Sequence, residues 1–353
     1  MLLTITILFP LFLQALTKPT ATPIRRAQCS NPLVRKEWKS FTVPQRTAYF
    51  NAFKCLKTKP HDPSLSPNPP IPGVPVDPSA SLYDDIVYLH AALVEKIHFS
   101  GIFLPWHRWY VNTVEQLLRS ECNYQGPMSY WDWTEDAADG VQESSVFGSN
   151  SQAGMGSLGQ ASNNFVVTDG AWVSQTLAYP SPHTIKRNFT VTPYREGQMA
   201  PPYLVTKPNA NVNRLVARGE VNRVVNDYRG DFVGFYNKFD EVEGFHSGLH
   251  FSIGGDMADP SWSPNDPLFF LHHGMLDRIW ALWQDRHPSN KNAFSGGSTW
   301  AVQSLQQFQT YGPSGMPPNL GTTAAIPNIG FGDSVTVADV LDTEGGYVCY
   351  VYA

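Results

Sequence analysis

The 353-residue sequence carries little charge, and it lacks several features that direct a first functional assignment. Charged residues make up 16% of it, against about a quarter in an ordinary globular protein. The basic residues form no stripe, and the formal net charge is −5, so nucleic acid and anionic membranes are poor candidate partners. No glycine-rich phosphate loop and no CxxC pair occur. These absences argue against nucleotide-binding and thiolate-zinc classes.

One long apolar run is present, and it lies at the N-terminus: "MLLTITILFPLFLQAL". We interpret residues 1–21 as a signal peptide, with the pair Arg25 and Arg26 as a further processing site near residue 26. A membrane anchor is the alternative, which Pro10 and the absence of any later bilayer-length apolar run disfavour. The sequence therefore predicts a secreted, extracellular protein with no membrane partner.

Cysteine is also scarce, with Cys29, Cys55, Cys122 and Cys349 as the full set. An even number in an exported chain indicates two disulfides, for which three pairings exist. We favour Cys29 with Cys349, which would tie the ends of the mature chain together, and Cys55 with Cys122. A single glycosylation sequon at Asn188 fits a glycoprotein of the same compartment.

Periodicity predicts a mainly α fold with long loops and a few short peripheral β-strands. Eight prolines in residues 60–78 predict an extended connection, and Ser, Gly and Asn in residues 144–163 predict a second long loop. Helices are expected over residues 81–101, 107–122, 233–253 and 267–288, and strands over 334–340 and 347–352.

The segment "FHSGLH" carries His246 and His250 four residues apart, which places both on one face of a helix. Two such histidines can hold one metal ion, although an isolated pair is more often solvated or hydrogen-bonded. The zinc-protease pattern HExxH needs a glutamate directly after the first histidine, and Ser247 occupies that position. The pair alone does not identify the site.

The distribution of histidine along the chain is more informative than this pair. Ten histidines occur, and seven of them fall in two windows: His90, His98 and His107, then His246, His250, His272 and His273. Each window combines helices with inward-facing imidazoles, which predicts a four-helix bundle around a metal site. Imidazole-only ligation suits copper, zinc or iron, and the lack of paired inward glutamates disfavours a di-iron centre, so we favour copper.

The motifs in the two windows resemble those of type-3 copper proteins. "HFSGIFLPWHRWY", "YWDW", "HSGLH" and "SPNDPLFFLHHGMLDRIW" are similar to segments of tyrosinases, catechol oxidases and other polyphenol oxidases, most closely the short secreted fungal type. The resemblance spans about residues 29–350. It implies a single catalytic domain over residues 27–353, without a C-terminal lid domain, and two copper ions as cofactor.

The resemblance also implies the roles of individual residues. One copper ion would be held by three histidines of the first window and the other by three of the second: His90, His98 and His107, then His246, His250 and His273. His272 would be a neighbour of the site, and Phe269 would project towards the metal pair and stack on an aromatic substrate. Asp277 is either a carboxylate supporting His273 or the partner of Arg108 or Arg278 in a structural ion pair.

The implied reaction is oxidation of ortho-diphenols, and of some aminophenols or monophenols, to ortho-quinones with O2. Ser247 replaces an asparagine that many phenol-hydroxylating members carry, which puts monophenol hydroxylation in doubt. Phe251 places a bulky ring beside the second copper position and would narrow the substrate range. The alternative is a haemocyanin-like O2-binding protein without turnover. We expect a monomer or weak dimer.

Overall fold

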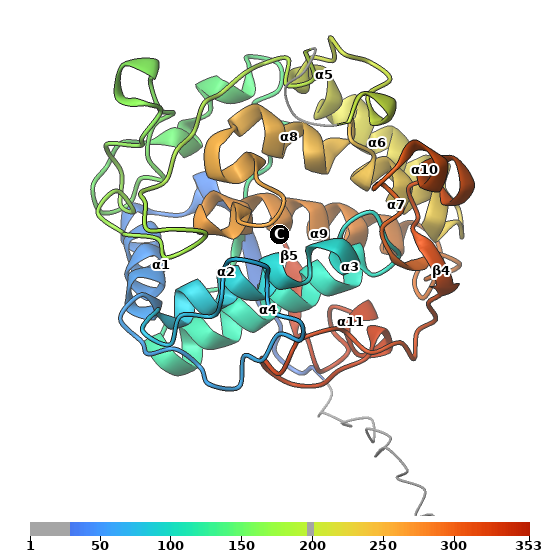
Figure 1. The fold of residues 1–353 in the computed structure, drawn as a ribbon, viewed down its shortest axis with the longest axis horizontal. Coiled ribbons are helices and arrows are strands. Elements are labelled where there is room, and N and C mark those ends of the chain that lie inside the picture. The colour runs from blue at the N-terminus through green and yellow to red at the C-terminus, as the bar shows by residue number, and fades with distance from the viewer. Residues whose placement is uncertain (1–28, 196–200) are drawn as a thin grey trace, which may run out of the picture.

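The computed structural model describes residues 29–195 and 201–353, so the predicted signal peptide lies outside the described residues. Two long helices, α4 (Phe103–Cys122) and α9 (Leu268–Arg286), cross the centre of the molecule in contact with each other. Helix α2 (Leu82–Ala92) lies in front of α4, and α8 (Phe245–Ile253) lies above α9 (Figure 1). The mainly helical fold built on four central helices is confirmed.

The first pair of central helices forms where the sequence provides caps and apolar faces. Ser81 caps α2 by accepting a hydrogen bond from the amide of Asp84, whose carboxylate in turn accepts from the Ser81 amide. Helix α2 is apolar and buried on nearly all sides, as expected of a central helix. Helix α4 ends at Asn123, which adopts the left-handed conformation that commonly terminates helices.

The helix over residues 81–101 is predicted to fray at His98, which would let the ring of His98 turn inward. The structure confirms that His98 lies outside the helix, but the helix breaks earlier than predicted. The chain leaves helical geometry at Leu93, resumes as the single turn α3 (Val94–Ile97), and is extended at His98, with φ −121° and ψ 152°. This break has a consequence for the site, because eight residues on an unbroken helix would separate His90 and His98 by about 80° around the axis. The extended residue turns the His98 ring back towards His90.

The second pair of central helices depends on two glycines that permit close approach of the backbone. Gly254 ends α8 with φ +72°, and a Cβ there would lie 2.0 Å from the side-chain oxygen of Asn188. Gly274 lies where α9 crosses strand β2 (Ser129–Tyr130), and a Cβ there would lie 2.6 Å from the Ser129 carbonyl oxygen. A side chain at either position would displace a neighbouring segment.

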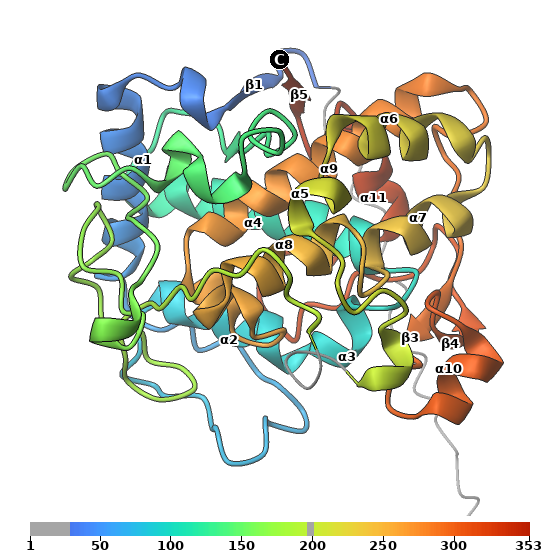
Figure 2. The same ribbon diagram turned by 90° about the horizontal axis from the view of Figure 1, so that it is seen from above.

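Shorter elements surround the central helices (Figure 2). The bounds of the remaining α-helices are α1 (Val43–Leu56), α5 (Val212–Leu215), α6 (Arg218–Asp227), α7 (Phe232–Asp240), α10 (Leu305–Tyr311) and α11 (Val337–Leu341). A parallel sheet has the order β2-β1-β5, with β1 (Leu33–Glu37) between β2 and β5 (Tyr350–Tyr352). Strands β3 (Gly297–Thr299) and β4 (Met316–Asn319) pair antiparallel.

Both predicted disulfides are confirmed, Cys29 with Cys349 and Cys55 with Cys122. The strand predicted over residues 334–340 is wrong, because Val337–Leu341 forms α11, which the side chain of Thr336 caps by pairing with Asp339. Alternation of apolar residues over so short a segment does not distinguish a strand from a helical turn. Within the two described ranges, no helix is long and apolar enough to cross a bilayer.

Candidate metal centre

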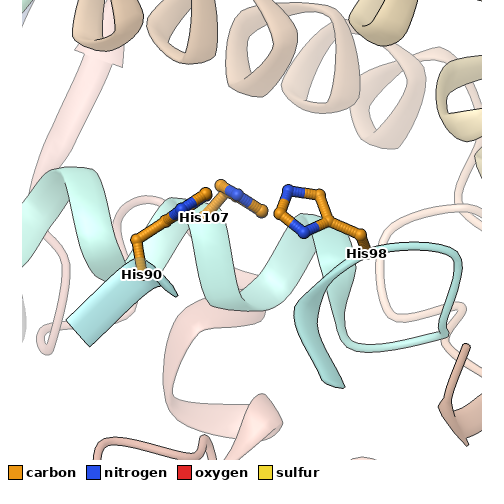
Figure 3. Close-up of side chains that lie close together, drawn as sticks. All are labelled: His90, His98 and His107. Carbon is orange, nitrogen blue, oxygen red and sulfur yellow. The ribbon is translucent and has the colours of Figure 1, made fainter. Parts of the chain in front are cut away.

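The first group of histidines lies between α2 and α4. His90 is on α2, His107 is on α4, and His98 follows α3, and all three are buried. Their rings point towards one another (Figure 3), with centroids 5.1 to 5.7 Å apart. One ligand nitrogen from each can be chosen so that all three lie within 4.8 Å of one another. This spacing lets three imidazoles share one ion.

The second group comes from α8 and α9 and has the same form. His246 and His250 lie one turn apart on α8, and His273 projects from α9. Their ligand nitrogens also lie within 4.8 Å of one another, and the Nε2 atoms of His250 and His273 are 3.2 Å apart. Two nitrogens about 2.0 Å from one tetrahedral ion are separated by roughly 3.3 Å, so this distance suits a shared ion.

The two histidine triads face each other across the helix pairs. The rings of His107 and His273 stack with centroids 4.3 Å apart, and those of His98 and His246 stack at 5.6 Å. The folded chain therefore brings together six imidazoles from segments more than a hundred residues apart. Two ions held here would be neighbours, as a dinuclear centre requires.

Hydrogen bonds on Nδ1 orient most of these rings. In four of them Nδ1 lies 2.6 to 3.1 Å from a backbone carbonyl oxygen: that of Ser261 for His90, Val94 for His98, Phe103 for His107 and Met257 for His250. This leaves Nε2 as the free ligand atom, the usual arrangement for a metal-bound histidine. Among the described residues, the Nε2 atoms of His90, His107 and His246 are buried without a partner. A metal ion would satisfy them.

Burial also sets the protonation state of the rings. It lowers the pKa of His98 from 6.5 to about 3 and that of His250 to about 4. The pKa values of the other four lie well below the ordinary value because of burial and, next, the neighbouring imidazoles. The rings are therefore neutral at physiological pH, the form that binds a metal. Neutral imidazole donors without thiolates or paired carboxylates suit copper.

One residue of this centre is absent from the sequence-based prediction. Asp240, at the end of α7, is fully buried and places a carboxylate oxygen 3.1 Å from Nδ1 of His246. Burial raises its pKa to about 8, while hydrogen bonds from the Tyr236 hydroxyl and the Phe99 amide act in the opposite direction. The sequence carries no signal for this contact, because Asp240 and His246 lie on different helices and the packing of α7 against α8 brings them together.

Two glutamates, Glu241 and Glu243, lie shortly before Ser247 in the sequence. Glu241 pairs with Lys238 at 3.0 Å, and Glu243 accepts a hydrogen bond from the backbone amide of Lys207. Both glutamates line a different cavity, which Ser247 does not line. Neither is therefore placed to act together with Ser247.

The remaining predicted site residues lie at different places around the triads. Ser247 and Phe251 line the cavity described below. Phe269 is fully buried and lies against both triads, stacked on His273 with centroids 4.0 Å apart and edge-on to His90 at 5.2 Å. Its ring therefore contacts histidines of both triads, but it is outside the cavity lining.

His272 lies beside the second triad without joining it. Its ring is parallel to that of His246 at 5.9 Å and perpendicular to that of His250 at 4.8 Å. The group of ligand nitrogens within 4.8 Å contains His273 and not His272. That His273 rather than His272 is the ligand stays a prediction, which this geometry supports.

Asp277 pairs with Arg108, one of the partners that the sequence left open. Nε of Arg108 lies 2.5 Å from the carboxylate, and both side chains are buried. Arg278 points elsewhere, with its guanidinium 3.9 Å from Asp132. This geometry favours a structural ion pair for Asp277 over support of a ligand.

A cavity of about 240 Å³ opens onto the triads. His98, His246 and His250 contribute to its lining, and most of the other lining residues are apolar, Phe251 and Trp300 among them. An aromatic ring entering this cavity would reach the open side of the metal positions.

Comparison with known proteins agrees with this geometry. The profile of the common central domain of tyrosinase matches residues 80–286, more than half of the chain. The chain belongs to the tyrosinase family. This tyrosinase-family protein is 28% identical to the tyrosinase-like protein phomQ1 of Diaporthe leptostromiformis, over 96% of its own length and 82% of that of the relative. It is 30% identical to the N-acetyl-6-hydroxytryptophan oxidase ivoB of Emericella nidulans, over 93% of its own length and 94% of the length of ivoB.

Among solved structures, the protein is similar to a variant of a polyphenol oxidase from Thermothelomyces thermophila. The TM-score is 0.69 with 28% identity, over 91% of this chain and 89% of the other. Family membership makes this tyrosinase-family protein an oxidoreductase, and its two histidine triads fit the dinuclear copper cofactor. An enzyme is therefore supported over the alternative of an O2-binding protein without turnover.

Proposed function

We propose that this protein oxidises ortho-diphenols to ortho-quinones, reducing one O2 to two water molecules for every two diphenols. The observation that carries the proposal is the pair of facing, neutral histidine triads at the end of a largely apolar cavity. We assign one copper ion to His90, His98 and His107 and the other to His246, His250 and His273. Copper ions bound by these residues would supply the redox chemistry, which is the transfer of electrons from the diphenol to O2.

The chain itself has three tasks in this proposal. Backbone carbonyls and Asp240 hold the imidazoles in the orientation that presents Nε2 to the metal. Phe269 packs against His273 and His90, one from each triad, which fixes these rings and limits access of water. Phe251, in the cavity lining, provides a flat apolar surface for a phenol ring.

We assign diphenols rather than monophenols as the principal substrates. Ser247 lacks an amide group that could help to order a water molecule beside the second copper position. Glu241 and Glu243, which could have supplied a base, line another cavity, and Ser247 is not part of its lining. Hydroxylation of a monophenol would therefore lack an assisted deprotonation step, whereas a diphenol is oxidised without hydroxylation.

The wider context of the protein is part of the proposal. Two disulfides and the exposed sequon residue Asn188 are consistent with passage through an oxidising compartment. We propose a secreted glycoprotein with a single catalytic domain over residues 27–353 that acts as a monomer or weak dimer.

Copper content and oxygen consumption together test this function. Copper-loaded protein should contain about two ions per chain and consume O2 with 4-methylcatechol. The variant His250→Ala should lose turnover and its second copper, because one triad then keeps only two imidazoles. Reversible O2 binding without quinone formation by the copper-loaded protein would refute the proposal in favour of an O2 carrier.

A further inference from the structure

We infer that the substrates of this site are catechols with an uncharged, apolar substituent, and that a carboxylate or an ammonium group on the substituent is selected against. This inference rests on the proposed diphenol oxidation and specifies its substrate class. The observation that carries it is the composition of the 240 Å³ cavity, whose described lining contains no lysine, arginine, aspartate or glutamate.

The lining offers surfaces for packing and very few polar groups. Three aromatic side chains, Phe99, Phe251 and Trp300, contribute to it together with aliphatic residues and prolines. Apart from the histidines, its polar side chains are the uncharged Ser247, Ser263 and Gln303. A substituent that leaves the metal positions therefore meets apolar walls before it reaches Gln303, which is exposed.

The size of the cavity leaves space for such a substituent. A dry cavity of about 150 Å³ is known to hold a benzene ring. A cavity of about 240 Å³ therefore takes a catechol ring with a substituent of several heavy atoms and contains most of it. A polar or charged group on the substituent loses its hydration on binding, so its charge determines the free-energy cost of binding.

A charged substituent would be desolvated here without a partner. Burial of an unpaired ion is unfavourable for either sign, because no protein charge replaces the lost hydration. The same fold provides charges in another cavity of about 350 Å³ behind α8, where Lys207, Arg214, Glu220 and Arg223 contribute to the lining. The absence of charged side chains is thus specific to the described lining of the histidine cavity.

Testing both signs of charge separates desolvation from an electrostatic field in the site. A net field would disfavour one sign and favour the other, whereas desolvation disfavours both. Two pairs of catechols differ mainly in charge: 3,4-dihydroxyphenylacetate with its methyl ester, and dopamine with N-acetyldopamine. The first pair tests a carboxylate and the second an ammonium group.

The experiment measures kcat/KM for these four catechols on the copper-loaded enzyme at neutral pH, by oxygen consumption. Each neutral member should exceed its charged partner by at least about tenfold, a discrimination typical of one unfavourable pocket contact. Equal values within either pair, or a preference for one charged compound, would overturn the inference. Absence of turnover with all four would instead refute the diphenol oxidation on which the inference rests.

Variants at the cavity mouth add a second measurement. Gln303→Lys should reduce the discrimination against the carboxylate and leave the discrimination against the ammonium group of dopamine undiminished. Gln303→Glu should reduce the discrimination against the ammonium group and leave that against the carboxylate undiminished. Gln306→Lys is the matched control, because Gln306 is exposed on α10 and outside the cavity lining, and it should leave both ratios unchanged. If Gln303→Lys and Gln306→Lys change the ratios equally, the cavity lining does not determine the substrate class.

Discussion

Replacing Asp277 with asparagine removes a negative charge that buried cationic groups share. Nε of Arg108 lies 2.5 Å from one carboxylate oxygen, and a guanidinium nitrogen of Arg35 lies 3.5 Å from the other. The hydroxyls of Tyr350 and Tyr352 donate hydrogen bonds to the same carboxylate. The group joins α9 to α4, β1 and β5, so its loss should weaken the whole domain.

The size of the effect follows from burial. Breaking a buried ion pair by removing one partner costs about 3–5 kcal/mol, because the remaining charge is left without compensation. The asparagine side chain is close to that of aspartate in shape, so we expect Asp277→Asn to lower the free energy of unfolding by roughly 3 kcal/mol. Tyr352→Phe removes the hydrogen bond to the carboxylate and a long one, 3.4 Å, accepted from Arg35, but leaves both charges in place. It should cost about 1.5–3 kcal/mol, less than loss of the charge.

The pH dependence gives an independent check. Burial alone would raise the pKa of Asp277, but Arg108, Arg35 and the two tyrosine hydroxyls hold it below its ordinary value of 3.8. A carboxylate with a lowered pKa contributes stability above the unfolded-state pKa and loses it as the pH falls through the folded-state pKa. The difference between wild type and Asp277→Asn should therefore be complete at neutral pH and shrink below pH 3.8.

Denaturant unfolding of the copper-loaded proteins measures these differences, and copper content and kcat are measured on the same samples. Asp277 pairs with Arg108 rather than with a histidine of the site, so below the unfolding transition Asp277→Asn should keep two copper ions and most of its kcat. A stability loss under about 1 kcal/mol would refute the reasoning about burial. Loss of one copper ion at unchanged stability would show instead that Asp277 supports His273.

Two further predictions concern positions around the second triad. A hydrogen bond with Asp256 at 2.7 Å raises the pKa of His183, while burial and Lys186 oppose the rise. The contribution of His183 to stability is therefore present below pH 6.5 and is lost as the pH rises through the raised pKa. Unfolding free energies of wild type and His183→Gln should therefore converge at alkaline pH, and a constant difference would contradict this assignment. Ser247→Asn should raise the ratio of monophenol to diphenol kcat/KM, with Ser247→Ala as the control. An unchanged ratio in Ser247→Asn would show that Ser247 does not limit hydroxylation.

Much of the architecture could be predicted from local sequence patterns. The helical period places His246 and His250 on one face, and the cap at Ser81 marks where α2 begins. The even number of cysteines, and the expectation that one bridge ties the two ends of the predicted domain together, indicated the disulfide pairing. These properties depend on residues near in sequence or on simple chemical complementarity, so they do not require knowledge of packing.

Short segments were less predictable because their conformation depends on what they contact. The alternation in residues 334–340 suggested a strand, yet the segment forms α11, which packs against α4. The helix that begins at Ser81 breaks already at Leu93, before the fraying predicted at His98, and this break lets the His98 ring turn towards its partners. Local propensity is a weak guide in both places because tertiary contacts outweigh it.

The sequence by itself determined the chemistry of this protein, through the number, type and spacing of its histidines and the motifs around them. Only the tertiary structure decided the partners of the buried groups and the lining of the cavity: Asp240 lies beside His246, Arg108 pairs with Asp277, and the described cavity lining has no charged residues. The physical reason is that ligand identity depends on local spacing, whereas the partner of a buried group depends on how helices distant in sequence pack. Desolvation then makes each of those partnerships energetically significant.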